Sequence, residues 1–457
     1  MLKQKNSPLN KFFILFIFLI AIVFSMLLIA KKTDSNKDHT RYNVLFILIE
    51  TLRADHLGCY GYKRNTSPNI DKIAEQGIRF TDFYTVCPWT NPTVASLFTG
   101  RYPQAIFPPK RHKQAIHQAI PEELDTLAEV LKNEGYNTIA LVDHPGINQN
   151  LNYSQGFNEF IPLFNKRGWH EWAGSKHSDI SEDLSLALEE NKNGRFFIYL
   201  HLLYPHLPYV PPAPFKDMFG PGFKDFTKQE SEGLINMYDG EIRYTDELVG
   251  NIFDHLRENN LLKNTYVIIT SDHGEGFWEH GTSEHGNSLY NELLKVPLII
   301  YPPGGRKAQP ATIDKLASNI DLFPTIMDFA KIENFPKADG KSLVRYFKKG
   351  AGGPAGIIFS ENPHSVCVDG MSCQSDQYKI IFTSPSHNSK REVYDIRKDP
   401  FEKNNLVSMG IPDAARMEKL LIDHKKDTDR KRMLLEQKDK KLDKASSDKL
   451  KSLGYLQ

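Results

Sequence analysis

Five short apolar runs, separated by helical patterns, constrain the fold of this chain more than any other feature. The first run, Asn43 to Ile49, is continuously apolar after its asparagine, which is typical of a strand buried on both faces. The other runs span residues 138–142, 196–201, 266–270 and 296–301, and the helical patterns span residues 121–134, 180–190 and 231–258. This alternation predicts an α/β fold with a doubly wound, mostly parallel sheet covered by helices on both faces.

From about residue 350 the pattern changes to shorter strands separated by turn residues. The strand-like runs are residues 356–359, 378–382 and 392–394, and a Lys-rich helical stretch follows at 417–457. We therefore expect a main domain over residues 42–349, a small C-terminal antiparallel subdomain over 350–412, and a Lys-rich helical tail over 413–457.

The N-terminus contains a run of 19 residues, Phe12 to Ala30, that is interrupted only by Ser25. This run is long enough to cross a bilayer as one transmembrane helix. Lysines lie on both sides of it, so the charge bias is small, and it favours a cytoplasmic N-terminus. We predict a cytoplasmic segment at 1–11, an anchor at 12–30 and a linker at 31–41. A cleaved signal peptide is the alternative, although Leu28-Ile29-Ala30 is a poor cleavage site.

Charge and cysteine content limit the classes of partner and cofactor. The net charge is +1, so no global field indicates nucleic acid as a partner. Cys367 and Cys373 are close enough in sequence to form a hairpin disulfide, or else remain two thiols. Cys59 and Cys87 are expected to be buried single residues, and the four cysteines form no zinc pattern with histidines.

Acidic and histidine side chains follow two of the predicted strands. Asp272 and His273 follow the run at 266–270 after Ser271 and precede glycines, and Glu50 directly follows the first run. A carboxylate and an imidazole together can bind a divalent metal, and a carboxylate after a fully apolar strand needs a partner. The alternatives are an ordinary turn at Asp272 and a cap or a salt bridge to Arg53 for Glu50.

A third element is the stretch CPWTNPTVASLFTGRYP, in which Pro92 suits the start of a helix and Thr90 lies close to that start. Backbone N–H groups at a helix N-terminus form an anion site. A threonine hydroxyl becomes a nucleophile at neutral pH only with help such as a bound metal. Thr90 is thus either a metal-activated nucleophile or a plain helix cap.

Together these stretches resemble the sulfatase-like branch of the alkaline phosphatase superfamily over roughly residues 43 to 410. The motifs that carry the resemblance, in family order, are NVLFILIETLRADHLGCYGY, SPNIDKIAEQGIRFTDFY, PWTNPTVASLFTGRYP, HLLYPHLPYVPP, YDGEIRYTDELVG, SDHGEGFWEHG, NIDLFPTIMDFA and VYDIRKDPFEKNNL. The resemblance implies an alkaline-phosphatase-like fold and a sulfatase-like catalytic domain at 42–349.

The chain departs from the usual sulfatase pattern at the nucleophile. Usual sulfatases carry Cys or Ser there, oxidised to formylglycine, within Cys-x-Pro-x-Arg; here the position falls on Thr90, and Val94 replaces the Arg. Glu50-Thr51 also replaces two adjacent aspartates. These differences argue against formylglycine.

The set formed by Glu50, Thr90, Asp272 and His273 is similar to that of membrane-anchored phosphoethanolamine and phosphoglycerol transferases of the superfamily. The resemblance implies that these four residues share one divalent metal ion, with Zn²⁺ or Mn²⁺ favoured and Ca²⁺ or Mg²⁺ as alternatives.

Several further residues match family positions. His206 and His285 match positions that face the reacting group, so the resemblance implies that they neutralise ester oxygens or protonate the leaving group. A structural role is the alternative for each, and His280 is a weaker candidate. His201 lies inside a strand pattern and is expected to be structural, as are Asp55 and Asp239.

The sequence therefore predicts a membrane-anchored, metal-dependent hydrolase of sulfate or phosphate esters that acts outside the cytoplasm, in the periplasm or at the cell surface. Its catalytic residues would be Thr90, His206 and His285. The partner would be an anionic ester, with a glycan or a lipid head group as candidates. The alternatives are a phosphoethanolamine or phosphoglycerol transferase that modifies envelope glycans, and a catalytically silent glycan-binding homologue.

Overall fold

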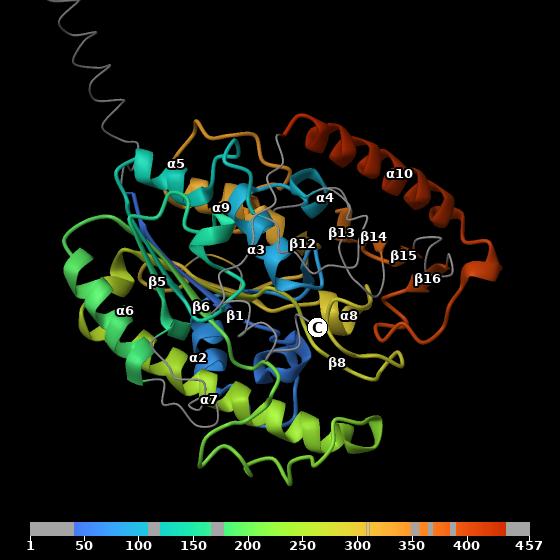
Figure 1. Cartoon of the computed structure of the whole chain (residues 1–457), viewed down its shortest axis with the longest axis horizontal. Coiled ribbons are helices and arrows are strands. Elements are labelled where there is room, and N and C mark those ends of the chain that lie inside the picture. The colour runs from blue at the N-terminus through green and yellow to red at the C-terminus, as the bar shows by residue number, and fades with distance from the viewer. Residues whose placement is uncertain are drawn as a thin grey trace, which may run out of the picture. The chain divides into compact units, whose positions relative to one another are not determined.

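An eight-stranded sheet runs through the centre of the protein, which we describe from a computed structural model (Figure 1). The structure describes residues 41–107, 119–165, 178–307, 309, 311–348, 356–363, 369–383 and 390–435, and those from Tyr42 onward lie in one compact unit. The anchor expected at 12–30 lies outside these residues. Among the described helices, none combines the length and the apolar character needed to span a bilayer.

The central sheet is mixed, not purely parallel. The strands in spatial order are β11 (Thr312–Ile313), β2 (Ile78–Phe80), β10 (Leu298–Tyr301), β7 (Thr265–Ser271), β1 (Asn43–Ile49), β6 (Phe196–Leu202), β4 (Asn137–Val142) and β5 (Glu159–Pro162). β1 pairs in parallel with β6 and β7, whereas β10 runs antiparallel to β7 and to β2. All five apolar runs of the sequence are therefore strands, and the last one reverses direction.

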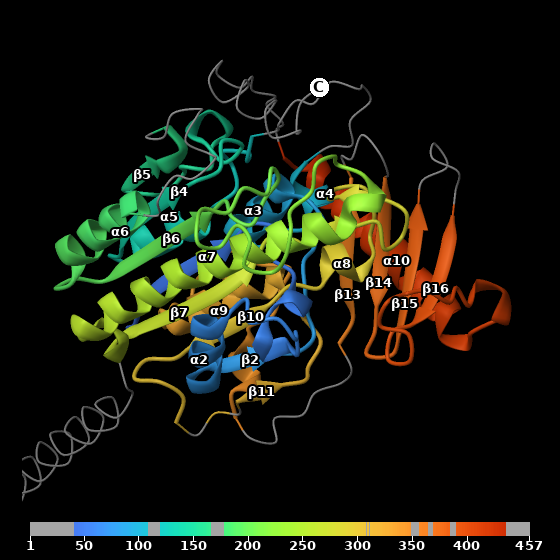
Figure 2. The same ribbon diagram turned by 90° about the horizontal axis from the view of Figure 1, so that it is seen from below.

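Both faces of the sheet are covered by helices, as the continuous apolar character of β1 predicts. Alternate β1 residues point to opposite cores: Phe46 belongs to one apolar cluster and Ile47 to the other. Helices α3 (Thr90–Thr99), α5 (Leu127–Asn133) and α9 (Leu322–Phe329) contribute to the first cluster. Helices α2 (Pro68–Gln76), α6 (Ser178–Asn191) and α7 (Ser231–Glu258) contribute to the second (Figure 2).

One predicted helix is shorter than expected. The pattern from residue 121 predicts a helix up to 134, but α5 begins only at Leu127. The reason is a capping box: Thr126 accepts from the backbone of Glu129, whose side chain accepts from the backbone of Thr126. The remaining short elements are α4 (Pro103–Ile106), α8 (Asn291–Leu294), β3 (Phe83–Tyr84), β8 (Gly276–Phe277), β9 (Ser283–Glu284) and β12 (Ala317–Ser318).

The C-terminal region is a four-stranded antiparallel sheet with one long helix packed on it (Figure 1). Its strands are β13 (Ile358–Asn362), β14 (Gly370–Gln374), β15 (Tyr378–Thr383) and β16 (Arg391–Asp395), and the helix is α10 (Pro412–Met433). β14, which holds the buried Cys373, was not predicted from the sequence. Cys367 and residues 436–457 of the tail lie outside the described residues. The domain boundaries after residues 349 and 412 stay predictions, since α10 shares an apolar cluster with this sheet.

Candidate active site

The carboxyl ends of β1 and β7 place three candidate metal ligands side by side. Ile49 is paired with Ser271 at the end of the two parallel strands, so the next residues, Glu50 and Asp272, emerge together. His273 follows directly, and all three side chains are buried. One ligand atom from each of Glu50, Asp272 and His273 lies within 4.8 Å of the others.

Thr90 lies against this cluster and is not a plain helix cap. It is the first residue of α3, and the capping position is taken by Trp89, which makes no side-chain capping bond. The Thr90 hydroxyl donates to Glu50 Oε1 at 2.5 Å and lies 3.2 Å from His273 Nε2. The structure therefore brings together all four residues of the predicted metal set.

The donor atoms in this cluster fit a divalent cation. His273 Nδ1 is 2.8 Å from the carbonyl oxygen of Gly274, and burial lowers the pKa of His273 to about 4. A neutral imidazole whose Nδ1 donates to a carbonyl has a lone pair on Nε2. The Nε2 atom of His273 lies 3.2 Å from Asp272 Oδ2. No described residue donates a hydrogen bond to this oxygen. Converging acceptors of this kind repel one another unless a cation lies between them.

Asp272 is in its charged form within this cluster. Burial works to raise its pKa, but His273, His201 and the hydrogen bonds that it accepts together hold the pKa below the ordinary value. Asp272 Oδ1 accepts from the backbone N–H groups of Thr51 and His273. Two carboxylate oxygens and one imidazole nitrogen are ligands that Zn²⁺ and Mn²⁺ accept. Arg53, the alternative partner for Glu50, pairs instead with Asp55 and Glu279.

Two further histidines surround Glu50. His201 Nε2 lies 2.6 Å from Glu50 Oε2, and burial lowers the pKa of His201 to about 4. His201, predicted to be structural, therefore orients a candidate metal ligand. His144 Nε2 lies 3.9 Å from Glu50 Oε1, and its ring stacks on His201. Since Gly146 N donates to His144 Nδ1, a neutral His144 carries its proton on Nε2, toward the site.

The two predicted catalytic histidines form the other side of the site. The ring of His285 lies 4.4 Å from that of His273 and 5.2 Å from that of His206, between centroids. His206 Nδ1 is 2.6 Å from the carbonyl oxygen of Leu207, so a neutral His206 has its lone pair on Nε2. Burial lowers the pKa of both His206 and His285 to about 4.

Two buried glutamates hold these histidines in place. Glu275 Oε1 lies 3.1 Å from His285 Nδ1, and Glu275 Oε2 accepts from the hydroxyl of Tyr209 at 2.7 Å. Glu241, on α7, accepts from the backbone N–H of Val210 at 2.6 Å and from that of His206, and so binds the loop that carries His206. Burial raises the pKa of Glu275 and raises that of Glu241 well above the ordinary value.

The remaining sequence candidates lie outside the reacting centre. His280 contacts Glu292 at 2.6 Å and the carbonyl of Glu402 at 3.1 Å, which makes it a structural residue. Asp239 binds three side chains of the loop after β1, namely His56, Tyr62 and Arg64, as its predicted structural role requires.

Two residues from the stretch that departs from the usual sulfatase pattern, Val94 and Cys87, are buried in the structure. Val94, in place of an arginine, packs in the apolar core, and burial raises the pKa of Cys87 well above its ordinary value. His144, Glu241 and Glu275 were not predicted from the sequence. Only His144 carried a usable signal, because it follows the end of β4 as Glu50 follows that of β1.

Comparisons with known proteins identify the family. The family model described as Sulfatase matches residues 42–332, and the model N-sulphoglucosamine sulphohydrolase, C-terminal, matches residues 279–432. The chain is 24% identical over 436 residues to the uncharacterized sulfatase YidJ of Escherichia coli strain K12, covering 80% of this chain and 83% of that protein.

Two solved structures show the same fold. One protein, in complex with its substrate D-Glucosamine-2-N, 6-O-disulfate, superposes with a TM-score of 0.68 at 20% identity and covers 86% of this chain and 98% of its own. The phosphonate monoester hydrolase of Agrobacterium radiobacter gives a TM-score of 0.66 at 19% identity and covers 87% of this chain and 97% of its own. Because the first family model matches more than half of the chain, the protein belongs to the sulfatase family and is a sulfatase-like ester hydrolase.

Proposed function

We propose that the protein hydrolyses sulfate esters with Thr90 as the nucleophile. The observation that carries the proposal is the position of the Thr90 hydroxyl, which donates to Glu50 Oε1 at 2.5 Å and lies 3.2 Å from His273 Nε2. Thr90 is completely buried, and by motif resemblance it stands at the family's nucleophile position. Threonine has no route to formylglycine, so the reaction must use the hydroxyl itself.

Glu50, Asp272 and His273 would hold one divalent metal ion beside Thr90. Such an ion would lower the pKa of the Thr90 hydroxyl and would place a positive charge beside the ester oxygens. Thr90 Oγ1 forms a bond to the sulfur, the bond from sulfur to the ester oxygen breaks, and the hydroxyl proton passes to Glu50. The anionic sulfuryl oxygens are met by the N-terminus of α3 and by the Nε2 proton of His144.

His206 and His285 provide the proton transfers on the opposite side. Each is a neutral imidazole that takes a proton from solvent and gives it to the leaving oxygen, and that later accepts a proton from the attacking water. Water then attacks the sulfur of the threonyl ester, the bond from sulfur to Thr90 Oγ1 breaks, Oγ1 takes back the proton held by Glu50, and inorganic sulfate leaves. Glu275 orients His285 during both transfers.

For the substrate we propose a sulfated sugar. The support is the sugar disulfate bound by the solved relative and the N-sulphoglucosamine sulphohydrolase model that matches the C-terminal region. For location we propose that the run from Phe12 to Ala30 anchors the protein to the cytoplasmic membrane, with the reaction site outside the cytoplasm.

A phosphoryl reaction is the second candidate. It is favoured by Thr90 and Glu50, which lie in contact. This pair is similar to the pair found in phosphoethanolamine and phosphoglycerol transferases. In that case an acceptor alcohol, in place of water, resolves the threonyl ester. Both reactions share the first step, so the leaving group and the acceptor separate them.

The test compares 4-nitrophenyl sulfate, 4-nitrophenyl phenylphosphonate and bis(4-nitrophenyl) phosphate, with Zn²⁺ or Mn²⁺ added, in wild type, Thr90→Ala and Thr93→Ala. Thr93 is a matched control, since it is buried on the same helix and donates to the carbonyl of Cys87, away from the cluster. We expect sulfate release that falls on the order of 10³-fold in Thr90→Ala and little in Thr93→Ala. Turnover that survives Thr90→Ala would show that Thr90 is not the nucleophile. If bis(4-nitrophenyl) phosphate is the only substrate with Thr90-dependent turnover, the transferase reaction is favoured.

A further inference from the structure

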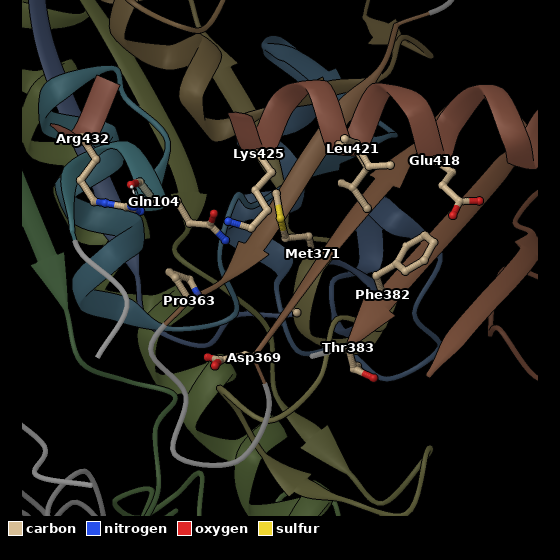
Figure 3. Close-up of a pocket in the computed structure, with 12 residues that line it drawn as sticks. Gln104, Pro363, Asp369, Met371, Phe382, Thr383, Glu418, Leu421, Lys425 and Arg432 are labelled. Carbon is tan, nitrogen blue, oxygen red and sulfur yellow. Dashed lines mark hydrogen bonds between the residues drawn. The ribbon is translucent and has the colours of Figure 1, made fainter. Parts of the chain in front are cut away.

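A cavity lies between α10 and the antiparallel sheet, and none of its lining residues belongs to the metal cluster. It has a volume of about 370 Å³, which is within the range of about 300–1,000 Å³ typical of small-molecule sites. Figure 3 shows side chains of α10 facing those of β14 and β15 across it. Its walls are largely apolar, with Met371, Phe382, Leu421 and Ile422 among the lining residues.

One buried polar group points to a ligand in this cavity. Gln104, on α4, lines the cavity and is 8% exposed, and no described residue donates a hydrogen bond to its Oε1 atom. A buried amide oxygen without a partner costs free energy that a bound hydroxyl or amide would recover. The backbone of Gln104 is already satisfied, since its N–H donates to Glu361. The side chain is therefore the part that is open to a ligand (Figure 3).

Three of the four charged side chains that line the cavity already have ion-pair partners on the protein. Lys425 and Arg432 line the cavity, but both form ion pairs with Asp429, each at 2.7 Å. Glu418 is likewise paired with Arg391 at 3.1 Å. Because these charges already have partners on the protein, an anion or a cation would gain little from them. A molecule with an apolar body and a hydroxyl or amide group matches the lining.

One hydrogen bond links the lining of the cavity to the loop that carries His285. Pro363 lines the cavity, and the residue before it, Asn362, donates from Nδ2 to the carbonyl of Gly286 at 2.9 Å. Gly286 directly follows the catalytic candidate His285. We infer that this cavity is a binding site for a neutral amphipathic molecule whose hydroxyl or amide group binds Gln104 and whose apolar group packs against Met371, Phe382 and Leu421.

The test measures binding of phenyl β-D-glucoside and hexyl β-D-glucoside to the full chain by titration calorimetry, with methyl β-D-glucoside as the probe that lacks the apolar group. Thr90→Ala is included because its binding must equal that of wild type, which separates this site from the proposed reaction. We expect Gln104→Leu, a change of similar size, to weaken binding about tenfold.

A matched pair of variants on α10 completes the test. Ile422→Asp places a carboxylate at the cavity, and Met433→Asp makes the same kind of change on the same helix outside it; the two residues are 49% and 78% exposed, so both variants should fold. We expect Ile422→Asp to abolish binding and Met433→Asp to leave it unchanged. Absence of binding in wild type, equal binding of the methyl glucoside, or binding unaffected by both Gln104→Leu and Ile422→Asp would overturn the inference.

Discussion

The two sides of the reaction site are built from different parts of the fold. The acidic side consists of Glu50, Asp272 and His273, which follow the ends of two adjacent central strands. The histidine side consists of His206 and His285, which lie on loops. Strand ends fix their side chains through the sheet itself, whereas the loop histidines need further side chains behind them.

The buried carboxyl groups of the two sides also differ in their charge. Asp272 has a pKa below the ordinary value because neighbouring histidines and N–H groups outweigh its burial. Glu275 and Glu241 have raised pKa values because burial dominates. Burial alone therefore does not decide whether a carboxyl group is charged. The hydrogen-bond donors and the charges around the group also set its pKa. A charged acid suits metal binding, and a less readily ionised acid suits the positioning of a histidine.

The largest expected effect comes from neutralising the acidic side. Asp272→Asn replaces a negatively charged ligand with a weak neutral one, so we expect loss of bound metal and a fall in turnover on the order of 10³-fold. Elemental analysis of the purified variant and turnover of 4-nitrophenyl sulfate check both results. Asp55→Asn is the control, because Asp55 pairs with Arg53 outside the cluster. Full metal content with full turnover in Asp272→Asn would contradict the metal assignment.

An intermediate effect is expected from the histidine side. Glu275 accepts with one oxygen from Tyr209 and contacts His285 with the other. Glu275→Gln leaves only one accepting oxygen, so His285 loses its orientation; we expect kcat to fall about 10- to 100-fold with metal content unchanged. Tyr209→Phe should have a smaller effect in the same direction. If Glu275→Gln instead releases the metal, the two sides are not independent.

This contrast also explains what could be predicted from the sequence. Glu50 was found because it directly follows an apolar strand, and Asp272 because it follows the end of another buried strand beside a histidine; both are local patterns. Thr90 needed the resemblance as well, since many helices begin at a threonine. β14 was missed because its residues, Gly370 to Gln374, include glycine, serine and glutamine and lack a clear apolar alternation.

The positioning glutamates could not be found in this way. Glu241 lies in the middle of α7, where a glutamate is ordinary, and only tertiary packing buries it against the loop that contains His206. Glu275 lies between two glycines and looks like a turn residue. The direction of β10 was not predictable either, because an apolar run carries no information on whether its neighbours are parallel.

A smaller effect on catalysis is expected from Glu241. Glu241→Ala removes the acceptor for the backbone N–H of Val210, so the loop that carries His206 loses an anchor; we expect kcat to fall about tenfold with little change in KM. Glu241→Gln keeps an accepting oxygen and should restore most of the activity. Steady-state kinetics of both variants check this. Equal activity of wild type and Glu241→Ala would show that the loop is held by other contacts.

The smallest expected effect is on stability, and it uses the raised pKa of Glu241. In the unfolded chain a glutamate loses its proton near pH 4.3, whereas burial keeps the proton on Glu241 in the folded protein to a higher pH. Above about pH 4.3 the unfolded state therefore binds fewer protons, and the free energy of unfolding falls as pH rises until it passes the folded-state pKa. Glu241→Gln removes this term, so its Tm relative to wild type should increase between pH 5 and 8, by about 2 °C or more.

Glu247→Gln is the control for that measurement, because Glu247 lies on the same helix with its side chain 53% exposed. Its Tm should follow wild type at every pH, since this change does not touch a buried side chain. Parallel Tm curves for wild type and Glu241→Gln would mean that Glu241 is charged in the folded protein. The carboxyl groups of the two sides would then not differ in the way proposed, and the positioning of His206 would rest on a charged hydrogen bond to its loop.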